Sequence, residues 1–175
     1  LRLLQFREKD LPKKERFSLG KDIKKLSDSY RVKFIVNGDP SLALALDADG
    51  VHLGRNTLPI QVVRDKLKFG GIIGYSAHTV KEVHYAFNSG ADYVTLSPVF
   101  ETISKTTSMP NLGLEIFREE IAKFSSPVYA LGGVSSVNAL DCLDAGAYGV
   151  AVVGAILGSD DPYSSTKEIL NAISY

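Results

Sequence analysis

Residues 72–99, IIGYSAHTVKEVHYAFNSGADYVTLSPV, contain the clearest indication of the fold. This stretch opens with a short apolar run at 72–77, continues as an amphipathic, charged segment at 79–89, and closes with a second apolar run at 93–99. Two such runs joined by a helical pattern predict parallel strands connected by a right-handed helical crossover. Because the runs are apolar along their whole length, we expect both faces of these strands to be covered.

The same alternation extends in both directions along the 175 residues. Further strands are predicted at 1–6, 32–37, 50–53, 127–133 and 149–154, and further helices at 12–29, 40–47, 58–68, 112–124, 136–145 and 162–174. A weak internal repeat accompanies this alternation. The segments 47–51 (DADGV), 90–94 (GADYV) and 146–150 (GAYGV) each predict a helix end, a turn and the start of a strand.

Seven strand–helix units predict an α/β fold of the TIM (β/α)8 barrel class, whose closed form has eight strands. We expect the first strand and helix to be missing from this chain, because it begins at Leu1 without a methionine and enters an apolar run at once. A doubly wound open sheet is the rival fold, but no Gly-x-Gly-x-x-Gly motif follows the opening strand. No linker or low-complexity tract divides the sequence, so we expect one barrel domain over 1–175.

The composition argues against several classes of protein. Twenty Lys and Arg residues balance twenty Asp and Glu residues, whereas a nucleic-acid binder normally has a basic excess. The single cysteine, Cys142, cannot form an internal disulfide, which favours a cytoplasmic location, and within a helix it is typical of a small buried residue. No apolar run approaches the roughly 18 residues of a membrane span, so no membrane contact is expected.

In a barrel the loops that follow the strands converge on one face, so polar residues just after strands are the candidates for function. Gln5, Arg7 and Lys9 alternate at the exit of the first strand, and a period of two places them on one face with Phe6 and Glu8 on the other. Such a row is costly unless it meets an anion. A solvated strand end, or Arg7 paired with a carboxylate, is the alternative interpretation.

Ser76 and His78 end another strand and share a face, and Thr79 can cap the helix that follows. Histidine is the side chain that gains and loses a proton near neutral pH, so His78 is the candidate acid or base. The alternative is that His78 only hydrogen-bonds its loop. His52, within an apolar strand, and His84, within a helix, fit that structural interpretation better.

Residues 101–113 form the longest polar loop. Thr102, Ser104 and Lys105 in this loop are typical of a phosphate clamp, although a loop without function has a similar composition.

Two glycine-containing sites end the last two predicted strands. Gly132 and Gly133 follow one strand, and Val153 and Gly154 follow the other. Barrels often bind phosphate at this place through backbone N–H groups, and glycine lets the backbone approach the anion. A tight turn is the alternative explanation for the glycine pair.

These motifs, in this order, resemble those of the thiamine phosphate synthase/TenI family. The resemblance covers essentially the whole chain. It includes Gln5-Phe6-Arg7-Glu8-Lys9, similar to the family's Gln-Leu-Arg-Glu-Lys signature, the segments 34–37, 42–45 and 48–54, Gly74-x-Ser76-x-His78-Thr79, and the segments 90–94, 98–100, 132–133 and 149–153. The family's barrel begins with one more strand and helix, which agrees with the expectation of a missing first unit.

The resemblance implies one of two chemistries. Thiamine phosphate synthases join a pyrimidine pyrophosphate to a thiazole phosphate and expel pyrophosphate with the help of Mg²⁺. TenI-type thiazole tautomerases aromatise a carboxythiazole phosphate tautomer by proton transfer and need no metal. Gly38 and Thr57 stand where a synthase has its two metal-binding aspartates, and a hard cation prefers carboxylate oxygens. Asp39 is one residue away, but a shift of one residue at a strand end directs the side chain elsewhere.

The departures lead us to expect a TenI-like tautomerase without a cofactor, with His78 as the acid and base. Gly133, Val153 and Gly154 would hold the phosphate by their N–H groups. Gln5, Arg7 and Lys9 would hold the carboxylate or other anionic end of the substrate. The remaining residues predicted to bind substrate are Asn37, Ser76, Thr102, Ser104, Lys105 and Gly132.

Two alternatives stay open. The first is an active synthase with a rearranged Mg²⁺ site, and the second is a non-catalytic protein that binds thiamine phosphate. In each case the expected partners are small phosphorylated thiazoles or pyrimidines. A homodimer is one way to cover the edge exposed if the first strand and helix are absent.

Overall fold

The structure, a computed structural model, describes residues 1–102 and 110–174. The chain divides into two compact units. The first unit comprises Leu1–Ser76 and Ala86–Asp92, and the second comprises Ala77–Tyr85 and Tyr93–Tyr175. The boundary falls near the end of strand β4 (Ile72–Ala77) and within helix α4 (Val80–Asn88).

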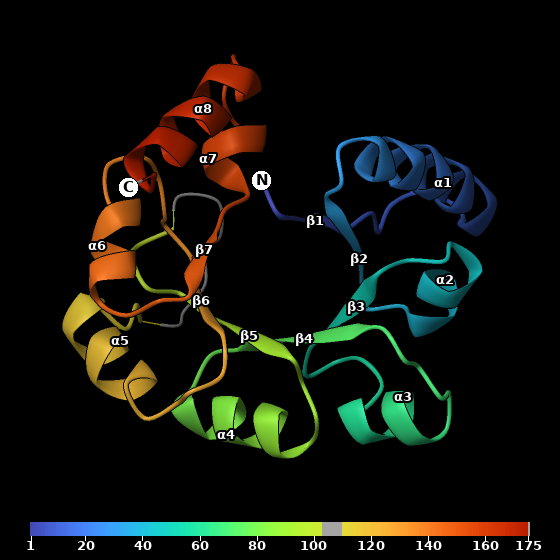
Figure 1. The fold of residues 1–175 in the computed structure, drawn as a ribbon, viewed down its shortest axis with the longest axis horizontal. Coiled ribbons are helices and arrows are strands. Elements are labelled where there is room, and N and C mark those ends of the chain that lie inside the picture. Colours follow the sequence, from blue (N-terminus) through green and yellow to red (C-terminus); the bar gives the residue numbers. More distant parts are fainter. Residues whose placement is uncertain (103–109, 175) are drawn as a thin grey trace. The chain divides into compact units, whose positions relative to one another are not determined.

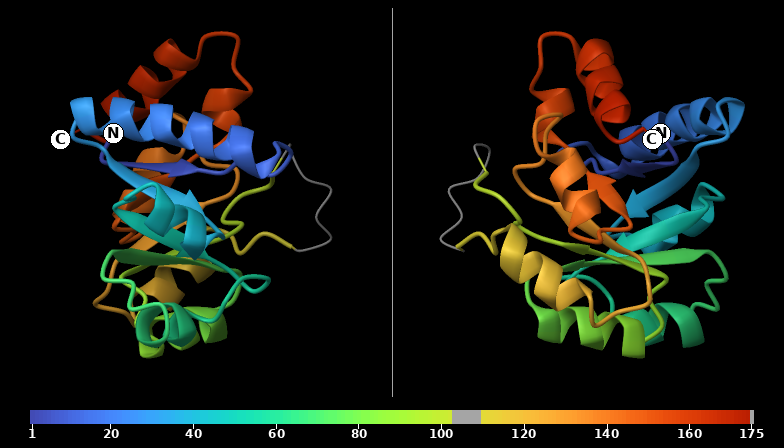
Figure 2. Two further views of the ribbon diagram at one scale, coloured as in Figure 1. Left: turned by 90° about the vertical axis from the view of Figure 1, so that its right-hand side faces the viewer. Right: turned by 60° about the vertical axis from the view of Figure 1, so that its left-hand side comes forward.

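The first unit alternates strands and helices, and its strands β1, β2, β3 and β4 pair in parallel in chain order. Helices α1, α2 and α3 lie on the same side of these strands (Figures 1 and 2). Besides β4, the elements are β1 (Leu3–Phe6), α1 (Lys13–Ser29), β2 (Lys33–Asn37), α2 (Pro40–Ala45), β3 (Gly50–Leu53) and α3 (Ile60–Asp65).

In the second unit the strands β5, β6 and β7 also pair in parallel in chain order. Helices α5 and α6 lie beside these strands, and α8 packs against α7 and α6 (Figure 1). The elements are β5 (Tyr93–Leu96), α5 (Leu114–Ile121), β6 (Val128–Leu131), α6 (Ala139–Asp144), β7 (Gly149–Ala151), α7 (Gly154–Leu157) and α8 (Pro162–Ala172).

The two faces of the first unit's strands have different roles. On one face the Phe6 and Phe34 rings stack with centroids 5.8 Å apart, and both side chains are buried. Helix α1 approaches this face closely at Gly20, where a Cβ would lie 2.7 Å from Leu46 Cδ1 and 3.1 Å from the Phe6 ring. Because side chains alternate along a strand, Gln5 and Asn37 lie on the opposite face, away from the helices.

The internal repeat of the sequence corresponds to three copies of one helix ending. In each copy the first residue of the repeat has a positive φ, +49° at Asp47, +96° at Gly90 and +98° at Gly146. The N–H of the following alanine then donates to a carbonyl five residues earlier, at 2.9 Å in the first copy and 3.0 Å in the other two. This is the Schellman ending, in which a residue in the left-handed region closes the helix.

The predicted succession of strands and helices is confirmed, and with it the α/β fold of the TIM (β/α)8 barrel class. Several predicted boundaries were wrong. The strands predicted at 93–99 and 127–133 end at Leu96 and Leu131. The strand predicted at 149–154 ends at Ala151, because Val153 has φ −131° and ψ −69° and its carbonyl accepts N–H groups from Ile156 and Leu157 in the short helix α7. The single domain over 1–175 stays a prediction.

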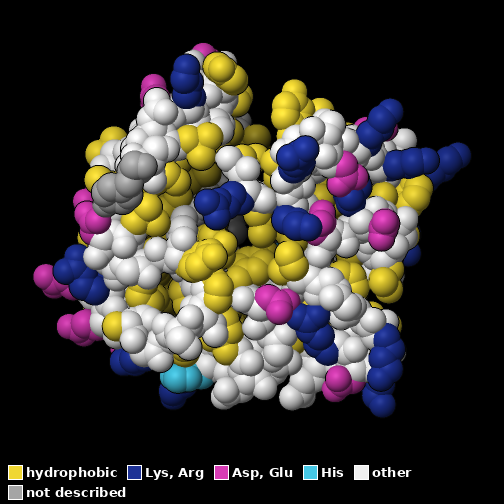
Figure 3. Space-filling model, in the orientation of Figure 1, with side chains coloured by type: hydrophobic (Ala, Val, Ile, Leu, Met, Phe, Trp, Pro, Cys, Tyr) yellow, Lys and Arg dark blue, Asp and Glu magenta, His cyan; other side chains and the backbone are white. Residues whose placement is uncertain are grey.

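The described surface mixes charges. On the face shown in Figure 3, basic and acidic side chains are interspersed among hydrophobic ones. None of the helices in the described ranges combines the length and the apolar character that a membrane crossing requires.

Candidate functional site

The four strands of the first unit carry polar side chains on one face near their carboxyl ends. Gln5 on β1 is in register with Ile35 on β2, which lies two residues before Asn37. Asn37 is in register with His52 on β3. His52 is in turn in register with Gly74, two residues before Ser76 on β4. Because residues in register point to the same face of a parallel sheet, Gln5, Asn37, His52 and Ser76 share one face.

Hydrogen bonds join these four side chains in pairs. Asn37 Nδ2 donates to Gln5 Oε1 at 2.8 Å, and His52 Nε2 lies 2.8 Å from Ser76 Oγ. The structure therefore brings the predicted residues Gln5 and Asn37 into contact. It also gives Ser76 a histidine partner, although the sequence pattern placed that histidine in a purely structural role.

His52 is the polar residue of this face that sequence reasoning missed. Its side chain is only 2% exposed, and burial lowers its pKa to about 4, so the ring is neutral at neutral pH. The available signal was its position, one residue before the end of the predicted strand 50–53, whose neighbouring strands have polar residues at or next to their ends.

Arg7 and Lys9 behave differently from Gln5. Strand β1 ends at Phe6, and both cations lie exposed beyond it. Within the described residues neither forms a hydrogen bond or an ion pair. Among the described residues, Arg7 therefore has no carboxylate partner of the kind that the alternative interpretation expects. A role for Arg7 and Lys9 in holding an anion stays a prediction.

Gly38 and Thr57, the positions where the resemblance places metal-binding aspartates, lie side by side. A Cβ placed on Gly38 would be 3.5 Å from Thr57 Cγ2. The Thr57 hydroxyl donates to Gly54 O at 2.8 Å and accepts from Gly54 N at 3.1 Å. Neither position offers the carboxylate that Mg²⁺ prefers.

Asp39, the nearby carboxylate, already has a structural role. Its Oδ1 accepts from Leu42 N at 3.0 Å, so Asp39 is the N-cap of α2. Its Oδ2 accepts from Arg16 Nη2 at 2.6 Å. The described residues contain no group of three or more His, Cys, Asp or Glu side chains that could hold a metal ion. The side chains at this place therefore do not fit Mg²⁺.

In the second unit, His78 is held at both its ring and its backbone. Its Nδ1 lies 2.8 Å from the Ser97 carbonyl oxygen and 3.2 Å from Ser97 Oγ. Because a carbonyl oxygen only accepts, Nδ1 carries the hydrogen in that contact, and the lone pair of the neutral ring is on Nε2. The His78 N–H donates to Glu82 Oε2 at 2.7 Å, while Thr79 Oγ1 accepts from Glu82 N at 3.3 Å.

That pair of bonds resembles a capping box at the start of α4. It confirms Thr79 as a cap, and it fixes the backbone that presents His78.

Gly132 and Gly133 have a structural reason to be glycine. Their φ values are +93° and +67°, and a Cβ would lie 2.7 Å from Pro98 Cα at Gly132 and 2.4 Å from Glu101 O at Gly133. The tight-turn interpretation that we ranked second therefore holds at this place. Phosphate binding through the N–H groups stays a prediction.

The remaining predicted residues lie at exposed places or outside the described ranges. Val153 is 61% exposed and precedes Gly154, which is also exposed and begins α7. Thr102 is half-buried, whereas Ser104 and Lys105 lie outside the described residues.

Two side chains that the sequence placed outside the site are in structural surroundings. Burial, with the nearby Asp141 charge, raises the pKa of the Cys142 thiol to about 11, so Cys142 is an inert buried thiol. The His84 ring packs on Phe124 with centroids 4.6 Å apart.

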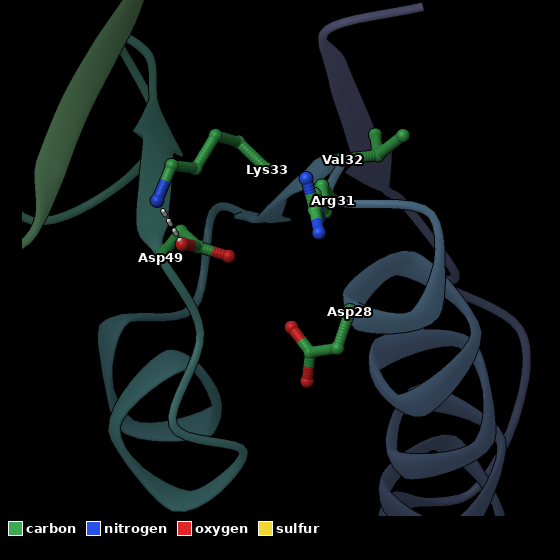
Figure 4. Close-up of a pocket in the computed structure, with 5 residues that line it drawn as sticks. All are labelled: Asp28, Arg31, Val32, Lys33 and Asp49. Carbon is green, nitrogen blue, oxygen red and sulfur yellow. Dashed lines mark hydrogen bonds and ion pairs between the residues drawn. The ribbon is translucent and has the colours of Figure 1, made fainter.

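A cavity of about 230 Å³ lies at the opposite, amino ends of the first unit's strands. Figure 4 shows the ion pair between Lys33 and Asp49 in this cavity, with Asp28, Arg31 and Val32 completing its lining. None of its lining residues is a predicted site residue. In barrels this end generally serves stability rather than catalysis.

The sequence matches the profile of the thiamine monophosphate synthase family (TMP-TENI) over residues 1–156. It is 35% identical to the thiamine-phosphate synthase of Prochlorococcus marinus, over 98% of this chain and 49% of that protein. It is 38% identical to the thiamine-phosphate synthase of Roseiflexus sp., over 95% of this chain and 71% of that protein. This chain thus spans about half the length of the first relative.

Among solved structures, a thiamine phosphate pyrophosphorylase from Pyrococcus furiosus superposes with a TM-score of 0.89 at 34% identity, covering 97% of this chain and 81% of that one. Sequence and fold therefore agree along nearly the whole chain: the protein belongs to the thiamine monophosphate synthase family.

Proposed function

We propose that this chain is a cytoplasmic enzyme of thiamine biosynthesis that joins a pyrimidine pyrophosphate to a thiazole phosphate, forming thiamine phosphate. The main support is its identity of 35–38% to thiamine-phosphate synthases over at least 95% of the chain. The sequence alone led us to rank a tautomerase first and a synthase second. The relatives favour the synthase.

The first unit offers a surface suited to a polar heterocycle. The paired Gln5 and Asn37 amides, together with the Ser76 hydroxyl, provide both donors and acceptors on one face. Arg7 and Lys9 provide two exposed positive charges that follow the same strand as Gln5. In the second unit the N–H groups at Gly133, Val153 and Gly154 are the proposed phosphate ligands.

A Mg²⁺ requirement does not follow from the residues present. Gly38 and Thr57 lack carboxylates, and Asp39 is occupied by the α2 cap and Arg16. We therefore expect the affinity for Mg²⁺ to be too weak to detect by calorimetry at millimolar concentration. The double variant Gly38→Asp/Thr57→Asp should gain measurable binding, because the two positions are adjacent and aspartate tolerates the positive φ of residue 38.

The matched control is Gly38→Asn/Thr57→Asn, which adds similar volume without charge and should not bind. Tight Mg²⁺ binding by the unmodified chain would contradict the assignment of a metal-free site.

The second candidate is the thiazole tautomerase, and two observations favour it. The metal positions lack carboxylates, and His78 has its Nδ1–H directed at a carbonyl oxygen, so Nε2 is available as a base. In such a reaction Nε2 accepts a proton from one atom of the thiazole tautomer, and the imidazolium returns a proton to another. No atoms are gained or lost.

Two assays on the full chain separate these functions. The synthase proposal predicts thiamine phosphate formation from the two phosphorylated substrates, with His78→Ala changing the rate less than tenfold. The tautomerase predicts aromatisation of the carboxythiazole phosphate without metal, and a loss of 10²-fold or more in His78→Ala, the usual size of an acid–base contribution. Binding of thiamine phosphate without turnover in either assay would identify a non-catalytic binder and contradict both enzymes.

A further inference from the structure

The contact between His52 and Ser76 joins a fully buried side chain to a partly exposed one. His52 is 2% exposed, whereas Ser76 lies near the carboxyl end of β4 with intermediate exposure. Their 2.8 Å contact spans two neighbouring strands of the first unit. Ser76 is thus the more accessible group of this pair, and His52 contacts it from within the sheet.

The backbone explains why the imidazole can reach Ser76. The residue in register with His52 on β4 is Gly74, which has no side chain. The ring therefore has room to extend along β4 to the next residue on the same face, which is Ser76. On the far side, a Cβ on Gly54 would lie 3.7 Å from Ser76 Cβ, so the hydroxyl lies at the strand end beside the 54–57 turn.

The neutral state of His52 constrains the hydrogen bond. Burial lowers the pKa of the ring to about 4, so at neutral pH the imidazole has one N–H and one lone pair. If Nε2 accepts from the hydroxyl, Ser76 Oγ offers lone pairs to a ligand. If Nε2–H donates, the serine hydroxyl hydrogen is left for the ligand instead.

We infer that His52 is a positioning residue that fixes the direction of the Ser76 hydroxyl and so sets whether this position offers a substrate a donor or an acceptor. The inference rests on the proposed function in one respect, since it takes Ser76 as a residue that binds the thiamine phosphate precursors or product. It goes beyond that function by assigning a role to a histidine inside the sheet. The expected benefit is preorganisation, because a hydroxyl held before binding loses less freedom on binding.

The test is a double-mutant cycle on the full chain, with thiamine phosphate affinity measured by isothermal titration calorimetry. Ser76→Ala and His52→Leu should each weaken binding about tenfold, the effect of one hydrogen bond. The double variant should be no weaker than either single variant, because His52 acts only through Ser76. His52→Gln, whose amide can still reach the hydroxyl, should recover most of the affinity.

His84→Leu is the matched control, since it removes a histidine that packs on Phe124 in the second unit, and it should leave the affinity unchanged. If His52→Leu weakened thiamine phosphate binding by the same factor in the wild-type chain and in the Ser76→Ala variant, the role of His52 would be purely structural. That result would overturn the inference and leave the proposed function intact. Absence of thiamine phosphate binding by the unmodified chain would overturn both.

A measurement on the unmodified histidine covers the case in which His52→Leu does not fold. The ring ¹⁵N resonances of His52 should shift when thiamine phosphate is added to the wild-type chain and should not shift in Ser76→Ala. Shifts of equal size in both proteins would contradict transmission through the hydroxyl.

Discussion

At the scale of single residues, the buried His52 makes the stability of the folded chain depend on pH. Its pKa of about 4 in the folded chain lies below the ordinary value of 6.5, so between these values the unfolded chain binds more protons than the folded chain. The corresponding stability is present above pH 6.5 and is lost as the pH falls toward 4, by up to about 3 kcal/mol.

We therefore expect the free energy of unfolding, measured by urea titration, to fall between pH 6.5 and 4.5 in the wild-type chain. His52→Gln removes the titrating group and should show a flatter profile over that range. Carboxylate titration below pH 4 should be common to both proteins. Parallel profiles of the two proteins from pH 6.5 to 4.5 would contradict the buried, neutral state of His52.

A second prediction for a single residue concerns the effect of Gly133→Ala on stability. A Cβ at this position meets the Glu101 carbonyl oxygen at 2.4 Å, and φ is +67°. Gly133→Ala should therefore lower the free energy of unfolding by about 2–4 kcal/mol, the range of overpacking combined with a left-handed non-glycine residue.

Gly70→Ala is the control for that substitution, because a Cβ there meets nothing within 4 Å and φ lies outside the positive range. It should be neutral or slightly stabilising. If Gly133→Ala proved equally harmless, the structural explanation for the glycine pair would fail, and the phosphate interpretation would gain weight.

At the scale of elements, two aspartates that precede strands perform the same task. Asp49, before β3, accepts from Phe34 N at 3.0 Å and pairs with Lys33. Burial by itself would raise the pKa of Asp49, but the bonds from Lys33 and Phe34 outweigh it and the pKa is lowered. Asp92, before β5, accepts from Ile73 N at 2.7 Å and pairs with Arg64. Each carboxylate thus binds a backbone N–H and a basic side chain within the first unit.

Arg64 adds three carbonyl contacts to its ion pair with Asp92. At the end of α3, it donates to Phe69 O at 3.1 Å, Gly71 O at 2.6 Å and Gly90 O at 3.3 Å. Arg64→Met keeps much of the apolar stem but removes the guanidinium from the three carbonyl oxygens and from Asp92. We expect a loss of about 2–4 kcal/mol in the free energy of unfolding.

Arg64→Lys tests the geometry of the guanidinium, since one ammonium group cannot reach all four acceptors. It should recover less than half of the loss, as measured by urea titration of both variants. Full recovery by lysine would show that charge alone matters at this position.

At the scale of the whole molecule, the prediction of a single domain over 1–175 can be tested by hydrogen exchange. If the chain folds as one domain, the slowest amides of β2 and β3 and those of β5 and β6 should exchange with the same free energy of opening. Mass spectrometry of peptides from the two units measures this directly. Opening energies that differ by more than about 2 kcal/mol would show that the two units unfold separately.

The order of strands and helices, the helix endings at 47, 90 and 146, and the family could all be predicted from the sequence. These features depend on local spacing. A single segment is enough to recognise an apolar run, a helical periodicity or a residue that adopts a positive φ. For the same reason, Gln5, Ser76 and His78 could be selected as candidates from their positions at strand ends, whereas Asn37 was selected through the family resemblance.

The contacts of those residues could not be predicted from the sequence and come from the three-dimensional structure. It paired His52 with Ser76, committed Asp39 to Arg16 and the α2 cap, and packed Gly132 and Gly133 against residues 98–101. Each of these contacts joins segments separated in sequence, and each depends on the register between strands or on the approach of one loop to another. A pattern within one segment does not contain that register, because a shift of one residue would exchange the two faces of a strand.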